Sequence, residues 1–206
     1  MITNGSIENF AAIDIGSAGN AGFASGRLGL INSSVSLVDV GWVTVGSSVN
    51  TSGVLDLDSS HMRAERLDLN ATGVVNMTVN GLTRASESLV GPGTYSAIDL
   101  GAMGEAGGSI RIDLGGLEFT TKATIDLITL DVGNDFSCSK FTKVEVLNLG
   151  SGMSYSTEYV AGDDTTGGIF RLVISGVSRC PADVNGDGEV SPADFNAWVL
   201  AFNNGC

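Results

Sequence analysis

Apolar and polar residues alternate in short segments through the first 176 residues, and glycine, serine, asparagine and threonine separate these segments. Because successive side chains of a strand point to opposite faces, such alternation predicts short strands with one buried face. The clearest form is a triplet in which an aspartate stands between two apolar residues, so that the aspartate faces outward. These triplets are centred on Asp14, Asp39, Asp56, Asp68, Asp99, Asp113, Asp126 and Asp131.

The spacing of the triplets predicts the architecture. Asp14, Asp39, Asp68, Asp99 and Asp126 follow one another at intervals of 25, 29, 31 and 27 residues. Such intervals match single coils of a solenoid, so we predict a mainly β protein in which residues 1–176 form a parallel β-solenoid, or β-helix. A β-sandwich is the alternative, because it also has short strands spaced by turns. The small number of large aromatic residues favours the solenoid.

The pattern is looser over residues 124–176. Strands are predicted at Ile125–Val132, Lys143–Leu149 and Ile169–Ile174, with a loop before the last of them. This order resembles the C-terminal closing segment of autotransporter-like repeat proteins. A solenoid end needs a cap because it presents unpaired strand edges, so we expect this segment to close the domain.

Residues 180–206 carry the pattern of a calcium loop followed by a helix. In such a loop the oxygens of positions 1, 3, 5, 7, 9 and 12 converge on one ion, and position 7 contributes its backbone carbonyl. Gly188 lies at position 6, where the chain turns sharply, and position 12 is aspartate where EF-hands carry glutamate. The predicted Ca²⁺ ligands are Asp183, Asn185, Asp187, the Glu189 carbonyl, Ser191 and Asp194.

The helix has clear signals at both ends. Ser191 is a good N-cap, Pro192 suits the first helical position, and Asp194 completes a variant of the capping box. Asn203, Asn204 and Gly205 are expected to end the helix. One apolar stripe repeats at helical spacing and consists of Phe195, Trp198, Val199 and Phe202.

Three stretches of this tail carry a family resemblance: Cys-Pro-Ala-Asp, Ser-Pro-Ala-Asp-Phe-Asn-Ala-Trp and Phe-Asn-Asn-Gly-Cys. Together they resemble a dockerin repeat of the cysteine-flanked, Gly-Cys-terminated variety found at the C-termini of large exported bacterial proteins. The family usually carries two repeats, and we find one. The resemblance implies docking to a cohesin-like or cell-envelope partner. The docking surface that we expect comprises Pro192 and Ala193 at loop positions 10 and 11, and the apolar residues Phe195, Trp198 and Phe202.

The three cysteines fit this division of the chain. Cys180 and Cys206 bracket the calcium motif, and we predict that they form a disulfide worth about 3–4 kcal/mol. A module this small buries little apolar surface on folding, so it needs a disulfide cross-link for stability. Cys138 is left over, and we expect it to be a small buried apolar residue.

Composition excludes some classes of partner. The net charge is −13, so the chain lacks the basic stripe that nucleic-acid binding requires. No apolar run approaches the roughly 20 residues of a membrane span, so no transmembrane segment is predicted. No export signal is visible near Met1, although the tail indicates a secreted or cell-surface bacterial protein. We therefore expect the chain to begin inside a longer protein.

Catalytic signals are sparse. His61 is the single histidine, which excludes a multi-histidine zinc site, and neither a Gly-x-Ser-x-Gly elbow nor a P-loop is present. His61 lies in the short polar stretch Ser59–Arg66. We expect this stretch to be a loop or a single helical turn in which the histidine is solvated. These features favour a non-catalytic structural or anchoring protein.

Two other hypotheses stay open. The chain could be the C-terminal portion of a β-helical polysaccharide-degrading enzyme, a lyase or a hydrolase, whose groove would unite Asp56, Asp68, Arg66 and Arg111. A polysaccharide would then be the partner. A carbohydrate-binding module would instead need a row of exposed aromatic residues, drawn from Trp42, Tyr95, Tyr155 and Tyr159. The outward aspartates are expected to face water, with a cation- or sugar-binding face as the functional alternative.

Overall fold

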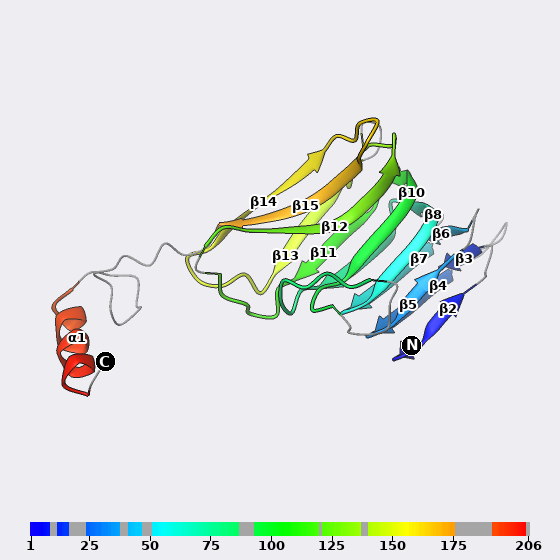
Figure 1. The fold of residues 1–206 in the computed structure, drawn as a ribbon. Coiled ribbons are helices and arrows are strands. Elements are labelled where there is room, and N and C mark those ends of the chain that lie inside the picture. Colours follow the sequence, from blue (N-terminus) through cyan, green and yellow to red (C-terminus); the bar gives the residue numbers. More distant parts are fainter. Residues whose placement is uncertain are drawn as a thin grey trace.

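The computed structural model describes residues 1–8, 12–16, 24–37, 41–46, 51–86, 93–119, 121–136, 140–175 and 191–204. Most of these residues form strands in two sheets that are largely parallel, and one helix follows near the C-terminus (Figure 1). The prediction of a mainly β protein is confirmed. Within these ranges no helix is both long enough and apolar enough to cross a membrane.

The first sheet has six strands, and every neighbouring pair is parallel. In their order across the sheet these strands are β1 (Ile2–Thr3), β4 (Ala24–Ile31), β7 (Thr51–Asp58), β9 (Gly73–Thr78), β11 (Ser109–Asp113) and β13 (Lys143–Leu147).

The second sheet is parallel up to β12 and antiparallel beyond it. Two short strands share one line beside β8, because β5 pairs with its beginning and β6 with its end. In the same way β2 pairs with β5, and β3 pairs with β6. The strands are β2 (Ser6–Glu8), β3 (Ala12–Ile15), β5 (Ser34–Ser36), β6 (Trp42–Val45), β8 (His61–Leu69), β10 (Ala97–Ala106), β12 (Ala123–Val132), β15 (Gly167–Ser175) and β14 (Ser154–Val160).

Along the chain the strands alternate between the two sheets, so that each circuit contributes to both. Circuit length varies widely. Paired residues are 20 positions apart at Val54 and Val74, and 35 apart at Val74 and Ser109. The difference in circuit length lies in the connections between strands, and the strands pair in parallel in both circuits.

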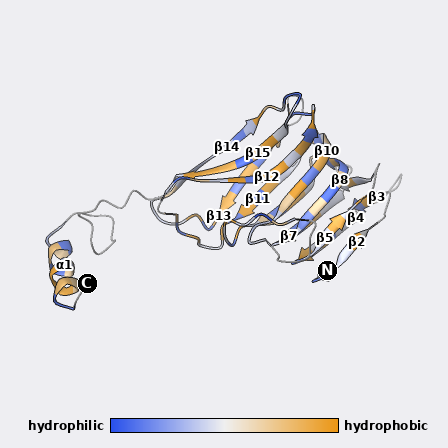
Figure 2. Cartoon of the chain, viewed as in Figure 1, coloured by the Kyte–Doolittle hydropathy of each residue, from blue (hydrophilic) through white to orange (hydrophobic). Residues whose placement is uncertain are grey.

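The core lies between the sheets and receives the apolar members of the triplets. Leu55, Leu57, Leu67 and Leu69 are at most 1% exposed, whereas the aspartates between them are half-buried on the outer faces. Figure 2 shows the resulting alternation of polar and apolar positions along the strands. The predicted strand periodicity is therefore present at these positions. The triplet centred on Asp39 lies outside the described residues.

The outward aspartates do not stack on one another. Asp99 lies between Arg63 and Thr129, and Asp126 pairs with Arg171. Asp56 lies between Gly29 and Asn76. Hence the intervals of 25–31 residues between the aspartates do not give the pairing register, and each of these carboxylates has neutral or cationic neighbours.

A column of buried serines stabilises one corner of the circuits. The side-chain oxygen of Ser60 accepts a hydrogen bond from the Ser33 backbone N–H at 3.1 Å, and that of Ser33 accepts one from Gly5 N–H at 3.2 Å. The residues just before these two serines, Asn32 and Ser59, have positive φ angles of 47° and 48°. The left-handed residue turns the chain toward the second sheet, and the serine hydroxyl satisfies the backbone donor that would otherwise be buried alone.

Two local expectations are wrong. Ser59–Arg66 is not a loop or helical turn, because most of it lies in β8, where Met62 and Ala64 enter the core between outward polar residues. The loop expected before Ile169 contains β14, which pairs antiparallel with β15. Beside this pair, four aromatic rings pack together at the C-terminal end of the body, from Phe136, Phe141, Tyr159 and Phe170.

Candidate functional site

The C-terminal helix α1 (Pro192–Asn203) begins as predicted. The Ser191 side chain accepts a hydrogen bond from Ala193 N–H at 3.2 Å, and the Asp194 Oδ2 atom accepts one from Ser191 N–H at 2.7 Å. This is a reciprocal capping box, and Asn204 is the C-cap. The capping prediction is confirmed. Asp194 is only 3% exposed, so its carboxylate is held at the start of the helix.

Most of the predicted calcium loop lies outside the described residues. This applies to Asp183, Asn185, Asp187 and Glu189, to the proposed disulfide partners Cys180 and Cys206, and to Cys138. Of the predicted ligands, only Ser191 and Asp194 are described. Within the described ranges no group of three or more His, Cys, Asp or Glu side chains gathers around a common centre.

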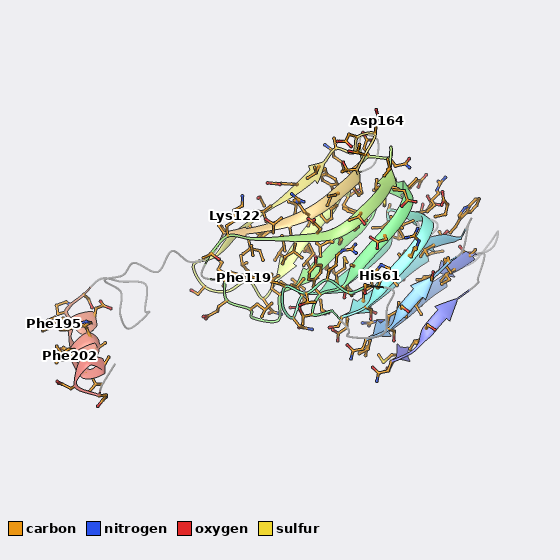
Figure 3. The ribbon with its side chains drawn as sticks, viewed as in Figure 1. His61, Phe119, Lys122, Asp164, Phe195 and Phe202 are labelled. Atoms are coloured by element: carbon orange, nitrogen blue, oxygen red, sulfur yellow. The ribbon has the colours of Figure 1, made fainter. Side chains whose placement is uncertain are left out.

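The apolar stripe of α1 is exposed to solvent. The exposed fractions are 65% for Phe195, 51% for Trp198 and 64% for Phe202. The Trp198 ring stacks between the other two, with centroid distances of 6.2 Å and 5.6 Å. Figure 3 shows Phe195 and Phe202 on α1. The helix therefore presents a continuous aromatic surface, and Pro192 and Ala193 at its first turn are exposed as well.

The residues expected in an enzyme groove do not converge. On the first sheet, Asp56 pairs with Arg27, and Arg111 pairs with Glu145 at 2.6 Å. Arg66 and Asp68 form their own pair at 2.8 Å on the second sheet. The four residues are thus divided between the outer faces of two sheets, and no single groove contains them.

The expected row of exposed aromatic residues is also absent from the described residues. Trp42 on β6 is 54% exposed and Tyr155 on β14 is 42% exposed. Tyr95 is buried, and Tyr159 packs against Phe170. These four aromatic residues therefore do not form one stacking platform.

A charged network that the sequence did not reveal is centred on Asp99 in β10. Arg84, from the connection between β9 and β10, donates to Asp99 Oδ1 at 2.6 Å and to Oδ2 at 3.3 Å. His61 Nε2 lies 2.7 Å from Oδ2, and Thr129 donates its hydroxyl to Oδ1. Burial alone would raise the pKa of Asp99, but the hydrogen bonds from His61, Arg84 and Thr129 outweigh it and hold that pKa well below its usual range.

His61 is not solvated, which corrects the expectation from sequence. It is 1% exposed on β8 (Figure 3), and its Nδ1 atom is buried without a hydrogen-bond partner among the described residues. Because Nε2 faces the carboxylate of Asp99, the tautomer protonated at Nε2 fits this geometry best. His61 and Asp99 are 38 residues apart, and no sequence motif links them.

A polar depression of about 300 Å³ lies on the outer face of the second sheet, beside this network. It spans strands β8, β10 and β12, and Arg63, Glu65 and Asp131 are among the residues that line it. Charged side chains of both signs thus meet at a position that sequence spacing alone does not indicate.

Comparisons of this chain with protein-family models, with curated proteins and with solved structures give no match.

Proposed function

We propose that this protein is a non-catalytic exported or cell-surface structural protein, attached through a C-terminal calcium-binding repeat of dockerin type. The observation that carries the proposal is the arrangement at α1, where a buried carboxylate at the helix start adjoins an exposed aromatic surface. Asp194 supplies the carboxylate, and Phe195, Trp198 and Phe202 supply the surface.

For the body of the protein we propose a β-solenoid. Strands that alternate between two sheets and pair in parallel with the preceding circuit are typical of solenoids. A β-sandwich of the immunoglobulin kind has antiparallel sheets, so the parallel pairing favours the solenoid. The antiparallel strands β15 and β14 would then act as its C-terminal cap.

The donor set of the tail suits Ca²⁺. All six predicted ligands are oxygen atoms, and calcium takes six to eight oxygen ligands. A buried carboxylate requires compensation, and a divalent cation would add to what the Ser191 N–H already supplies to Asp194. Asp183, Asn185, Asp187, Glu189, Ser191 and Asp194 would hold the ion, which would order the loop before α1.

The partner would be a cohesin-like or cell-envelope module with an apolar groove. Large exposed apolar patches commonly mark interaction sites, and stacked aromatic residues are favoured anchors at interfaces. Covering Phe195, Trp198 and Phe202 would remove three large side chains from water at once. With one repeat, the partner would bind a single helix face.

Calcium titration calorimetry of the full, oxidised chain tests the metal site. We expect one Ca²⁺ per chain, loss of binding in Asp187→Asn, and unchanged binding in Asp164→Asn, which alters an exposed aspartate between β14 and β15. Absence of calcium uptake by the wild-type chain would overturn the proposal.

Attachment is tested separately with washed cell envelopes of the producing bacterium. The wild-type chain should co-sediment with them in Ca²⁺, and Trp198→Ala with Phe202→Ala should abolish co-sedimentation. Tyr155→Ala is the matched control, because it removes an exposed aromatic ring from the body. Equal co-sedimentation of all variants would refute docking through α1.

A further inference from the structure

The polar depression on the outer face of the second sheet has a floor made by glycine. An ideal Cβ atom added to Gly101 on β10 would lie 2.6 Å from the Glu65 carboxylate, so the glutamate side chain lies over this position. Gly104 is similar, because a Cβ there would meet the guanidinium of Arg66 and the carboxylate of Asp68. Side chains of β8 therefore lean over the β10 backbone, and the Glu65 carboxylate forms part of the wall of a shallow trough.

Polar groups from neighbouring strands converge on this trough. It is lined by Arg63 and Glu65 from β8, by Asp131 from β12 and by Ser36 from β5, together with Leu37, Ala64 and Gly101. Leu100 pairs with Leu130, so Gly101 and Asp131 are the next residues of two neighbouring parallel strands. Glu65 on β8 and Asp131 on β12 are two strand spacings apart, about 9.6 Å, so they lie on opposite sides of Gly101, and the Glu65 carboxylate reaches over this glycine.

One end of the trough is held rigidly. Arg63 is opposite Asp99, and Asp99 is opposite Thr129, so the Asp99 network borders the depression. Arg84 and His61 both bind the Asp99 carboxylate, which keeps that side chain from turning into the trough. Asp99 is therefore a fixed neighbour of the trough and not one of its lining groups.

An exposed indole lies along the same face. Trp42 pairs with Arg66, the residue after Glu65. Its neighbour Val43 and the nearby Val45 are buried in the core, so the Trp42 side chain points to the outer face, where it is 54% exposed. The lining of the trough thus supplies carboxylates, a guanidinium and a hydroxyl, and the Trp42 indole lies on the same face of the sheet, outside that lining.

We propose that this trough binds a neutral oligosaccharide. Carboxylates accept hydrogen bonds from sugar hydroxyls, Arg63 donates to sugar oxygens, and the apolar face of a pyranose ring can stack on Trp42. An anionic polysaccharide fits poorly, because the described lining residues include two carboxylates and one guanidinium, and the chain carries a net charge of −13. This inference concerns the body and does not depend on the calcium tail.

A peptide ligand is disfavoured by the strand arrangement. β8, β10 and β12 each have a strand on both sides, so none of them offers an open edge to which a peptide could add as a strand. Among the described lining residues the apolar side chains are Leu37 and Ala64, and both are buried, so this part of the lining offers no deep pocket for peptide side chains. Hydroxyl groups spaced along a sugar chain match the polar lining better.

The experiment uses the full chain with Trp198→Phe, which leaves Trp42 as the only tryptophan. Cellohexaose, xylohexaose, mannohexaose and oligogalacturonate are titrated in EDTA, with Trp42 fluorescence and calorimetry as readouts. We expect saturable binding of at least one neutral hexasaccharide, and at least tenfold weaker binding in Glu65→Gln and in Asp131→Asn. EDTA removes any contribution of the calcium loop, so failure here is distinct from failure of the attachment proposal.

Steric variants complete the test. Gly101→Ala places a methyl group on the trough floor and should weaken binding at least tenfold, whereas Gly29→Ala on the outer face of the first sheet should not. Asp56→Asn serves as the matched charge control on that same sheet. Binding of oligogalacturonate alone, binding of a peptide library alone, no binding at all, or equal affinities in Gly101→Ala and Gly29→Ala would each overturn the proposal.

Discussion

His61 Nε2 lies 2.7 Å from Asp99 Oδ2, and Arg84, which lies between these two residues in the sequence, binds the same carboxylate. Three segments that are separate in the sequence thus share one partly buried anion. Because hydrogen bonds favour the ionised form, the pKa of Asp99 lies below its usual range despite burial. The network connects β8, β10 and the segment between β9 and β10.

The first prediction concerns acid stability. A carboxyl whose pKa is lower in the folded state stabilises the protein above its unfolded pKa of about 3.9, and this stabilisation is lost as the pH falls through the folded pKa. Asp99→Asn should therefore cost about 2–3 kcal/mol at pH 7 and flatten the loss of stability below pH 4. Urea unfolding between pH 7 and pH 2 measures both effects. An unchanged acid slope in the variant would contradict it.

The second prediction concerns the pair Arg84 and Asp99. Arg84→Met should destabilise the fold by about 1–2 kcal/mol, and Arg84→Lys should restore only part of this, since lysine cannot donate in the same forked geometry. A double-mutant cycle with Asp99→Asn should give a coupling energy of at least about 0.5 kcal/mol. If the changes in unfolding free energy of the two single variants sum to that of the double variant, the contact between Arg84 and Asp99 does not contribute to stability.

The third prediction concerns the serine column. Ser60→Ala removes the acceptor of the buried Ser33 N–H and should cost about 1–3 kcal/mol. Ser52→Ala is the control, because Ser52 is exposed on β7 and its replacement should change stability by less than about 0.5 kcal/mol. Thermal melts compare the two. Equal effects would mean that the column is dispensable.

The fourth prediction concerns the turn at Asp163. Hydrogen bonds from the Thr165 side chain and from the backbone N–H groups of Thr165 and Thr166 lower the pKa of Asp163 to about 2. Thr165→Val removes the side-chain donor and should move this pKa toward the usual aspartate value, and Thr165→Ser should leave it low. Carboxyl ¹³C NMR titration reports each value directly. A pKa near 4 in the wild-type protein would refute the arrangement.

The fifth prediction concerns the start of α1. Ser191→Ala removes the N-cap acceptor and should destabilise the helix by about 1 kcal/mol. Asn196→Ala, on the exposed side of the same helix, should leave helicity equal or higher because alanine is the better helix former. Circular dichroism at 222 nm in the presence of Ca²⁺ compares the variants. A loss of helicity in Asn196→Ala as large as in Ser191→Ala would count against the capping role.

Sequence reasoning located the strands whose apolar residues alternate with aspartate, because a buried face leaves a period of two in the sequence. It misread β8, where His61, Arg63 and Glu65 give a polar appearance to a strand that is central in its sheet. His61 is tolerated because Asp99 on β10, which is distant in sequence, binds its ring, and Arg63 and Glu65 are tolerated because they are exposed on the outer face. It also missed β14, an edge strand whose polar residues face solvent on both sides.

Some of the candidate sites could be predicted from the sequence, and others could not. The capping box and the aromatic stripe of α1 were predictable because they depend on residues three to seven positions apart. The Asp99 network and the trough depend on register between strands, and circuits of 20 and 35 residues make that register invisible in a single sequence. The role of Gly101 likewise depends on the Glu65 side chain that lies over it, and this contact between two strands cannot be predicted from the sequence.

Because its circuits differ in length, this body tolerates connections of different length between its strands. A scaffold that displays inserted peptides needs this property. Residues 79–96 connect β9 to β10, and the strands on both sides of this connection keep their parallel partners. A foreign peptide inserted into this connection would therefore leave the ladder hydrogen bonds of β9 and β10 intact. A peptide library inserted there would be carried by a body whose described secondary-structure elements, β1 to β15, are all strands.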